Sequence, residues 1–358
     1  GFPWNPPASV VADAPALLGS LPVWGATGLG WALVASGSGL WALVRLPSRR
    51  PGLAVLATAL GLTVAATLVA PAARPAGAPL AVAVLQPGSS LEEKWDPNEW
   101  MEMERRVWAL TDEAAARGAQ VVLWPESAVP FRFDAEPDYR ARVIDTARRL
   151  GLTIVLNSVA GSATEGYANS AFVVGPDGQA GPRYDKLRLV PFGEFVPWWA
   201  RLAFSDALVR EVGTFEPGAR TVLLDVGVPA GMAICYEVVF AELAAREVRD
   251  GAQLLTTLTN DGWYGYSWAP RQHCAQAVLR AVETRRWLAR AALTGISVIV
   301  DPAGREVARL EVGDNGALVA EVVPCRGVTP RARFGDWWMA VAAVAALALL
   351  AVGRRQRG

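Results

Sequence analysis

The chain of 358 residues is long enough for one large domain or two ordinary ones, and its 52% of hydrophobic and 19% of charged residues exclude an intrinsically disordered protein. Its 34 basic residues balance its 34 acidic ones, so no basic surplus marks a nucleic-acid-binding protein. Three cysteines without a C-x-x-C pair, and one histidine, exclude a disulfide framework, a zinc ribbon and a multi-histidine metal site, which leaves carboxylates, lysine and thiols to carry the chemistry.

Three uncharged stretches are predicted to cross a membrane, at 14–44, 52–73 and 337–352. For any single stretch, a buried core helix is the alternative. Arginines follow the first and the third, and short arginine-rich loops stay in the cytoplasm. The expected organisation is a membrane segment with two transmembrane helices, an extracytoplasmic domain, and a C-terminal transmembrane helix with a basic cytoplasmic tail. These three parts cover residues 1–73, 74–330 and 331–358.

Alternating strand and helix patterns in the middle segment predict an α/β layer. An Asp-Gly turn at 177–178 indicates a β-hairpin after the first three strands. The predicted strands are 80–86, 120–124, 152–159, 221–226, 230–236, 254–259 and further strands within 296–323. The predicted helices are about 97–117, 138–150, 240–251 and 269–287. Helices outside mixed sheets favour a layered sandwich.

Reactive side chains follow several of these strands, where open α/β sheets place their sites. Glu126 comes directly after a buried strand and a proline, so it is poorly hydrated and suits a general base; an ordinary helix-start carboxylate is the alternative. Lys186 and Glu194 are embedded among apolar residues and prolines, where a lysine could stabilise an oxyanion or a thiolate, unless the segment is a solvated loop. Asn260 and Asp261 either line a pocket or cap a turn.

A cysteine at the end of a strand is the candidate nucleophile. Cys235 occupies that position, with Glu237 two residues later, although a cysteine in an apolar run is more often an inert core residue. Cys274 and Cys325 are predicted to be structural. His273 is predicted to be a hydrogen-bonded helix residue rather than a catalytic base.

The order of Glu126, Lys186 and Cys235 resembles the Glu-Lys-Cys constellation of the nitrilase, or carbon–nitrogen hydrolase, superfamily. Four longer motifs resemble the apolipoprotein N-acyltransferase family within it. They are Trp-Pro-Glu-Ser at 124–127, Val-Pro-Phe-Gly-Glu-Phe-Val-Pro at 190–197, Ile-Cys-Tyr-Glu at 234–237 and Asn-Asp-Gly-Trp-Tyr-Gly at 260–265. The resemblance covers essentially the whole chain and implies a nitrilase-like α-β-β-α sandwich flanked by transmembrane helices. Because that family has more spans than three and the chain begins with Gly1, the chain is expected to be the C-terminal portion of a longer enzyme.

The resemblance also implies an activity, the transfer of a fatty acyl chain from a phospholipid to the α-amino group of the diacylglyceryl-cysteine of apolipoproteins. The enzyme would work without a cofactor or metal at the outer face of a bacterial cytoplasmic (inner) membrane, and would not bind nucleic acid. Glu126 would be the general base, Cys235 the nucleophile that forms a thioester, and Lys186 the stabiliser of the oxyanion. The supporting and substrate-binding residues implied with them are Glu194, Tyr236, Glu237, Trp95 and Asn260.

Two alternative functions share most of these features. A membrane-tethered amidase would use the same triad on a small C–N substrate with water as acceptor, and a non-catalytic membrane scaffold would keep the fold alone. A further hypothesis concerns the aromatic segment 198–204, with Trp198, Trp199 and Phe204. Because tryptophan is favourable at a bilayer interface, this segment is expected to be a lid through which acyl chains reach Cys235.

Overall fold

A computed structural model describes residues 4–90, 93, 96–162, 164, 166–197, 215–344 and 347. Its helices are α1 (Leu21–Arg45), α2 (Arg50–Val69), α4 (Trp100–Ala116), α5 (Pro137–Leu150), α7 (Ala241–Arg249), α8 (Ala269–Thr284) and α9 (Pro330–Phe334), with short 3-10 helices η1 (Pro7–Val11), η2 (Pro15–Leu17), η4 (Cys235–Val239) and η5 (Asp261–Tyr264). Its strands are β1 (Arg74–Pro75), β2 (Leu80–Gln86), β3 (Val121–Leu123), β4 (Thr153–Gly161), β5 (Tyr167–Val174), β6 (Tyr184–Asp185), β7 (Leu224–Asp225), β8 (Pro229–Ile234), β9 (Leu254–Thr259), β10 (Leu288–Ala292), β11 (Ser297–Val300), β12 (Glu306–Leu310), β13 (Gly316–Val322) and β14 (Cys325–Arg326).

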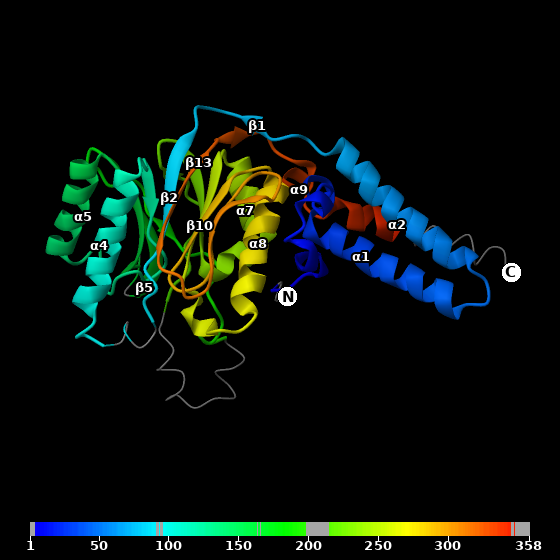
Figure 1. Cartoon of the computed structure of the whole chain (residues 1–358), viewed down its shortest axis with the longest axis horizontal. Coiled ribbons are helices and arrows are strands. Elements are labelled where there is room, and N and C mark those ends of the chain that lie inside the picture. Colours follow the sequence, from blue (N-terminus) through cyan, green and yellow to red (C-terminus); the bar gives the residue numbers. More distant parts are fainter. Residues whose placement is uncertain are drawn as a thin grey trace.

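Two six-stranded sheets pack face to face in the described part of the chain (Figure 1). The first has the order β13-β2-β3-β4-β5-β6, and the second has the order β12-β11-β10-β9-β8-β7. Side chains alternate between the two faces of a strand, so Val82 and Val84 enter the core between the sheets while Ala83 and Leu85 face the helices. Helices α4 and α5 cover the first sheet, and α7 and α8 cover the second. This arrangement confirms the α-β-β-α sandwich that the sequence predicts.

The parallel strands at the centre of each sheet bring distant parts of the sequence together. Strands β2, β3 and β4 run parallel in the first sheet, and β8, β9 and β10 run parallel in the second. The carboxyl ends of the two sets meet, because the backbone N–H of Asn260, after β9, donates a hydrogen bond to Glu126, after β3. Segments that follow these strands therefore share one edge of the sandwich.

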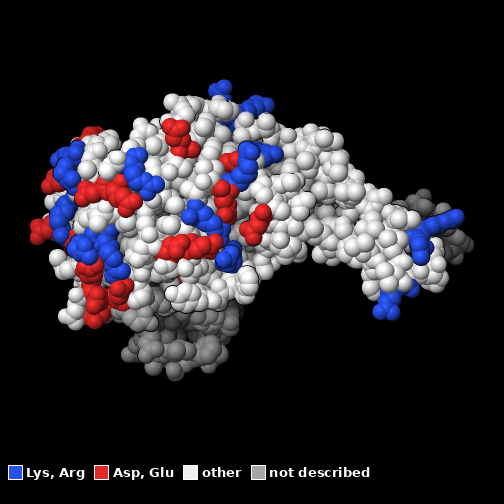
Figure 2. All heavy atoms as spheres, viewed as in Figure 1, with Lys and Arg blue, Asp and Glu red and all other residues white. Residues whose placement is uncertain are grey.

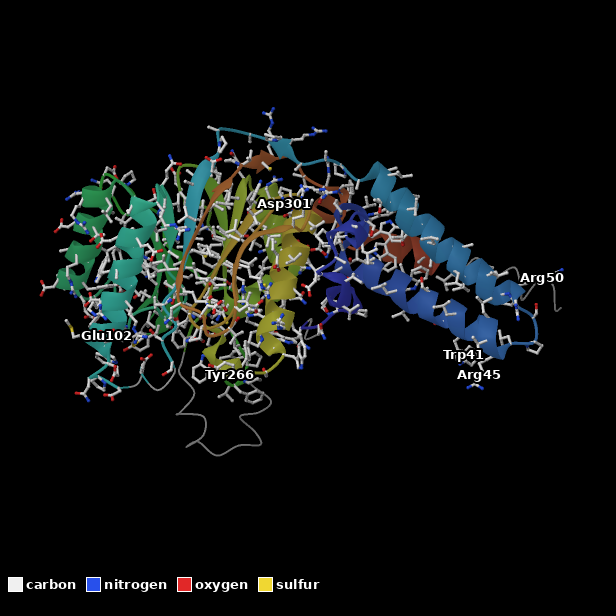
Figure 3. The ribbon with its side chains drawn as sticks, viewed as in Figure 1. Trp41, Arg45, Arg50, Glu102, Tyr266 and Asp301 are labelled. Atoms are coloured by element: carbon white, nitrogen blue, oxygen red, sulfur yellow. The ribbon has the colours of Figure 1, made fainter. Side chains whose placement is uncertain are left out.

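Helices α1 and α2 form an arm that extends away from the sandwich (Figure 1). Both are long and apolar enough to cross a membrane. Figure 2 shows charges of both signs over the sandwich, whereas the visible face of the arm carries charge only at its tip. Figure 3 locates Arg45 and Arg50 at that tip, at the turn between the two helices.

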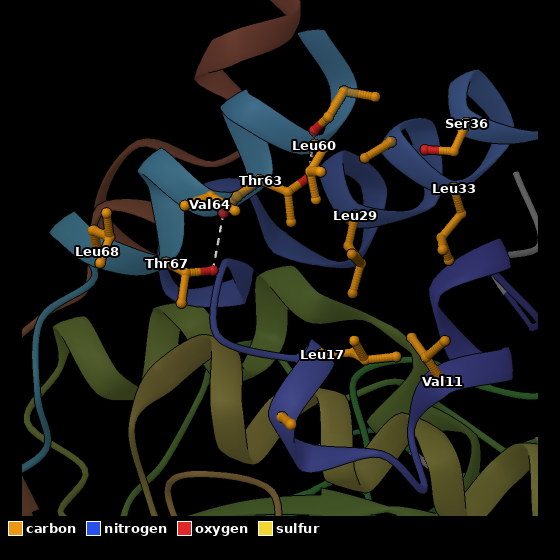
Figure 4. A pocket seen from close by; sticks show the side chains of 13 residues that line it. Val11, Leu17, Leu29, Leu33, Ser36, Leu60, Thr63, Val64, Thr67 and Leu68 are labelled. Atoms are coloured by element: carbon orange, nitrogen blue, oxygen red, sulfur yellow. Dashed lines mark hydrogen bonds between the residues drawn. The ribbon is translucent and has the colours of Figure 1, made fainter. Parts of the chain in front are cut away.

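An apolar cavity of about 340 Å³ lies between the arm and the short helices η1 and η2 (Figure 4). It is lined by Val11, Ala16, Leu17, Leu29, Ala32, Leu33, Ser36, Ala59, Leu60, Thr63, Val64, Thr67 and Leu68. None of these residues belongs to the sandwich and none is ionisable, so this cavity is not where the predicted chemistry would take place.

Several element boundaries differ from those expected. The first long helix begins at Leu21 rather than near residue 14, because Pro15 starts a separate 3-10 turn. Helix α8 ends at Thr284, before the expected residue 287, and strand β10, which the sequence pattern does not predict, follows it. Residues 337–344 are helical, as expected for the start of the third span, while most of its remainder lies outside the described residues.

Candidate active site

Four side chains singled out in the sequence lie where the two sheets meet. Glu126 follows β3, Lys186 follows β6, Cys235 follows β8 and Asn260 follows β9. All four are buried, with exposed fractions between 1% and 7%. Since isolated buried charges are costly, their partners decide what the site can do.

Lys186 lies between two carboxylates. Its Nζ donates a hydrogen bond to Glu194 Oε1 at 2.8 Å and lies 3.7 Å from Glu126 Oε1. Burial on its own would lower the pKa of the Lys186 ammonium, but the negative charges of Glu126 and Glu194 outweigh it, so that this pKa lies above its usual value. Lys186 is therefore a fixed positive charge beside the base and the thiol.

Asn169 on β5 connects the two carboxylates, and sequence reasoning did not identify it. Its Nδ2 donates to Glu126 Oε1 at 2.8 Å and to Glu194 Oε1 at 3.0 Å, and its Oδ1 accepts a 2.6 Å hydrogen bond from Asn157 on β4. Glu126 Oε2 accepts from the backbone N–H of Asn260 at 2.9 Å. Both oxygens of Glu126 are thereby held in place. The signal in the sequence is polar residues within strands that are otherwise apolar.

Cys235 is the first residue of η4 and follows directly after β8, where the chain turns. Its φ of 52° lies in the left-handed region, which is uncommon for any residue with a side chain. Burial and the nearby Glu126 carboxylate raise the pKa of the Cys235 thiol, while Lys186 opposes them. The resting sulfur is therefore a thiol that needs a base to remove its proton as it reacts.

Glu237 links the segment that carries Lys186 to the strand that carries Cys235. Its carboxylate accepts hydrogen bonds from the backbone N–H groups of Leu187 at 2.7 Å and Ile234 at 2.8 Å, and from the Tyr184 hydroxyl at 2.9 Å. Burial raises the pKa of Glu237 to about 7, although these donors oppose the rise. The sequence neighbours of Lys186 and Cys235 are thus bound to one side chain.

The other predicted residues have more varied positions. The Asn260 side chain accepts from the backbone N–H of Gly262 at 3.0 Å, so it caps the turn while its own N–H binds Glu126. Tyr236 is buried and packs edge-on against Phe240, with ring centroids 4.9 Å apart. Trp95 and the proposed lid segment 198–204 lie outside the described residues.

His273, Cys274 and Cys325 are all buried. His273 lies on α8 and is hydrogen-bonded, as the sequence predicts. Burial raises the pKa of Cys274 to about 12 and also raises that of Cys325, whose Sγ donates to the backbone carbonyl of Val323. Within the described residues, no three His, Cys, Asp or Glu side chains are arranged to hold a metal ion.

Comparison with known proteins places these features in a wider group. Residues 81–326 match the carbon-nitrogen hydrolase family. The chain is 40% identical over 287 residues to the apolipoprotein N-acyltransferase of Geobacter metallireducens, covering 78% of the chain and 55% of the relative. It is 36% identical over 383 residues to that of Bradyrhizobium diazoefficiens, covering 99% of the chain and 70% of the relative. The chain thus spans between about half and 70% of the length of these two relatives.

Two solved structures share the sandwich fold. An amidase of the nitrilase superfamily from Nesterenkonia superposes with a TM-score of 0.52 at 23% identity, covering 70% of the chain and 93% of the amidase. Saccharomyces cerevisiae Nit3, of branch 10 of the same superfamily, superposes with a TM-score of 0.54 at 20% identity, covering 71% of the chain and 93% of Nit3. At these identities the likeness establishes the fold.

Proposed function

The chain belongs to the carbon–nitrogen hydrolase family and, within it, to the apolipoprotein N-acyltransferases, and from this premise we propose that it moves a fatty acyl chain from a phospholipid to an apolipoprotein. The acceptor is the α-amino group of the diacylglyceryl-modified cysteine at the apolipoprotein N-terminus. The observation that carries the proposal is the convergence of Glu126, Lys186 and Cys235 at the strand ends, in a chain with two helices apolar enough to span a membrane.

In the first half-reaction, Cys235 Sγ attacks the carbonyl carbon of a phospholipid ester while Glu126 takes the thiol proton. Lys186, which remains charged, stabilises the negative oxygen of the tetrahedral intermediate. The ester C–O bond then breaks, and the proton on Glu126 passes to the departing oxygen. The products are a lysophospholipid and a thioester on Cys235.

In the second half-reaction, the α-amino group attacks the thioester carbon and Glu126 takes a proton from the amine. The C–S bond breaks, the sulfur recovers the proton, and an amide is left on the acceptor. The two steps return Cys235 to its thiol form and involve no oxidation or reduction. Glu126 therefore acts as base and then acid in each half, which requires the firm placement of both its oxygens.

The remaining residues support this chemistry in the proposal. Glu194 and Glu237 position Lys186 and the Cys235 turn through the hydrogen bonds described above, and Asn260 positions Glu126. Tyr236 and Trp95 contribute to substrate binding.

We assign the topology on the same basis. Residues 1–73 would carry two transmembrane helices, 74–330 the extracytoplasmic catalytic domain, and 331–358 the third helix and a cytoplasmic tail, in a multi-pass protein of the bacterial inner membrane. Support comes from the apolar arm and from the arginines at its tip, which belong on the cytoplasmic side. The phospholipid donor and the lipoprotein acceptor both reside in that membrane, so the sandwich would meet them at its surface.

The test is a transfer assay with the full chain in phospholipid vesicles and a synthetic diacylglyceryl-cysteine peptide. Mass spectrometry should show the peptide gaining one acyl group at its amine, and the Cys235→Ala variant should leave it unchanged. Release of free fatty acid without acylated peptide would instead indicate a hydrolase of the amidase type. Absence of any acyl product with a folded protein would indicate a scaffold.

A further inference from the structure

The only histidine of the chain, His273, contacts the backbone of the candidate nucleophile, Cys235. His273 is fully buried on α8, and its Nε2 lies 3.0 Å from the backbone carbonyl oxygen of Cys235. Its Nδ1 lies 2.9 Å from Asp261 Oδ1 and 3.1 Å from Arg290 Nη2. The imidazole therefore connects the backbone of the thiol residue to a buried ion pair.

The neighbours of the ring define where its proton sits. A carbonyl oxygen can only accept, so Nε2 must carry the hydrogen and donate it to Cys235. Burial and the adjacent Arg290 lower the pKa of His273, although Asp261 opposes them. Nδ1 lies within hydrogen-bond distance of both Asp261 Oδ1 and Arg290 Nη2, so this ion pair holds the ring on the side away from Cys235. Asp261 also accepts hydrogen bonds from Arg290 Nη2 at 2.7 Å and from the Thr259 hydroxyl at 3.0 Å.

His273 binds the backbone of Cys235, which has a strained conformation. A residue other than glycine stays in the left-handed region only where its surroundings fix it there. At Cys235, with φ of 52°, the hydrogen bond from His273 holds the carbonyl on one side, and the Glu237 carboxylate holds the N–H of Ile234 on the other. Rotation of the Cys235 peptide would redirect Sγ away from Glu126 and Lys186.

Trp4, in the segment before the first membrane helix, covers the other side of the histidine. Its ring stacks on His273 with centroids 5.1 Å apart and an interplanar angle of 23°. Its Nε1 donates to Gln272 at 2.9 Å, and its carbonyl accepts from Gln276 at 3.0 Å, so it is fixed to α8 by two hydrogen bonds. A segment that leads into the arm is thus packed onto the support of the nucleophile.

We propose that His273 is a positioning residue for acyl transfer: it holds the Cys235 carbonyl and thereby orients the thiol. Trp4 in turn keeps the imidazole ring of His273 in place. The role of His273 in acyl transfer rests on the proposed function, whereas its hold on the Cys235 backbone does not. His273 takes no proton from substrate and contacts no reacting atom. Its role is to keep Sγ within reach of the base, and a displacement of about 1 Å at a reacting atom can cost about a hundredfold in rate.

Two variants of His273 separate positioning from simple packing. The amide nitrogen of glutamine reaches the place of Nε2 and that of asparagine the place of Nδ1, so His273→Gln keeps the donor to Cys235 and His273→Asn loses it, while both lose the stack with Trp4. We expect His273→Asn to slow alkylation of Cys235 by iodoacetamide, and the formation of its thioester, by about tenfold or more. His273→Gln should stay within about threefold of the wild type in both reactions. KM for phospholipid should be unchanged in both variants, and melting temperatures report whether they fold.

The outcomes are distinguishable. Equal rates for the glutamine and asparagine variants would overturn the positioning role. If the wild type gains no acyl group from phospholipid but the two variants still differ in alkylation, the proposed function fails and the positioning role stands. Should His273→Asn not fold, Trp4→Leu provides the second test, with an expected slowing of alkylation by about threefold in protein that remains folded at the assay temperature; an unchanged rate would contradict the role of Trp4.

Discussion

At the scale of single residues, the site depends on one cation balanced against two carboxylates. Lys186 is buried between Glu126 and Glu194, and Asn169 donates to both. Removing one partner of a buried ion pair leaves an uncompensated charge and typically costs about 3–5 kcal/mol. The arrangement therefore couples the stability of the site to its chemistry.

Replacement of Lys186 tests this coupling. We expect Lys186→Met to lower the free energy of unfolding by about 3–5 kcal/mol and the rate of Cys235 acylation by about 10²–10³-fold, since both the buried charge balance and the oxyanion contact are lost. The double variant Lys186→Met/Glu194→Gln removes the excess carboxylate as well. It should regain much of the stability, measured by thermal unfolding, but none of the activity. A double variant no more stable than the single one would contradict the buried charge balance.

Glu237 should give the protein a pH-dependent stability in an accessible range. Its pKa is about 7 in the folded state and 4.5 in the reference state, so the folded protein binds the proton more tightly. The stability from this group is fully present below pH 4.5 and is lost as the pH rises through about 7. Between pH 5 and 8, the melting temperature of the wild type should fall more steeply than that of Glu237→Gln. Parallel curves would show that Glu237 does not titrate in this range.

The sequence identifies the residues at strand ends better than those within strands. Glu126 and Cys235 interrupt apolar runs at predicted strand ends, Lys186 interrupts an apolar segment with prolines, and their grouping follows from the sheet topology. Asn157 lies within β4 and Asn169 within β5. The antiparallel pairing of these two strands brings the two side chains together, beside the carboxylates of Glu126 and Glu194. The bond from His273 to Cys235 depends on how α8 packs, which no local pattern encodes.

At the scale of elements, the joint between the arm and the sandwich depends on a break in helix α1. Gly25 has φ of 69°, and a Cβ there would lie 2.3 Å from Arg331 Nε. The break exposes main-chain groups that find partners elsewhere. The carbonyls of Val23 and Trp24 accept hydrogen bonds from the indoles of Trp337 and Trp338, and the N–H of Ala26 donates to Glu283.

A pair of glycine substitutions on the same helix tests the joint. Gly25→Ala should destabilise the protein by about 1–3 kcal/mol, because it combines a left-handed backbone with a steric overlap. Gly37→Ala is the control, since nothing lies within 4 Å of its Cβ position, and it should stabilise the helix by about 0.5–1 kcal/mol. Thermal unfolding in the same detergent compares them. Equal effects of the two changes would mean that Gly25 is not special.

Elements with strong periodicity are predicted well, and short ones are not. Strands β2 and β9 have the bounds expected from the sequence: β2 is a largely apolar run, and β9 is a buried run of leucines and β-branched threonines. Strand β10, with the sequence Leu-Ala-Arg-Ala-Ala, lacks β-branched residues and follows α8 after three residues. Its position is fixed by pairing with β9 and β11 on either side, and Arg285 in the left-handed region ends the helix before it.

At the scale of the whole molecule, charge is segregated between the sandwich and the arm. The arm has an uncharged surface in view and a basic tip, which favours a membrane orientation with the tip in the cytoplasm (Figures 2 and 3). The proposed function requires the sandwich on the opposite side, beside the lipoprotein substrates.

Cysteine labelling measures this orientation directly. The three native cysteines are buried, so Ser48→Cys at the tip and Ala141→Cys on α5 would each add one exposed thiol. In intact spheroplasts, a membrane-impermeant maleimide should label Ala141→Cys, and should label Ser48→Cys only after lysis. Labelling of Ser48→Cys in intact spheroplasts would contradict the orientation.

The most direct measurement of the central claim is the mass of the Cys235 peptide after the full chain is incubated with phospholipid of one known acyl composition and no acceptor. We expect an added mass equal to that acyl group, sensitive to hydroxylamine as a thioester is, and absent after Glu126→Gln. An unmodified Cys235 in folded, lipid-bound protein, or the acyl group on another residue, would contradict the claim that this thiol carries the fatty chain.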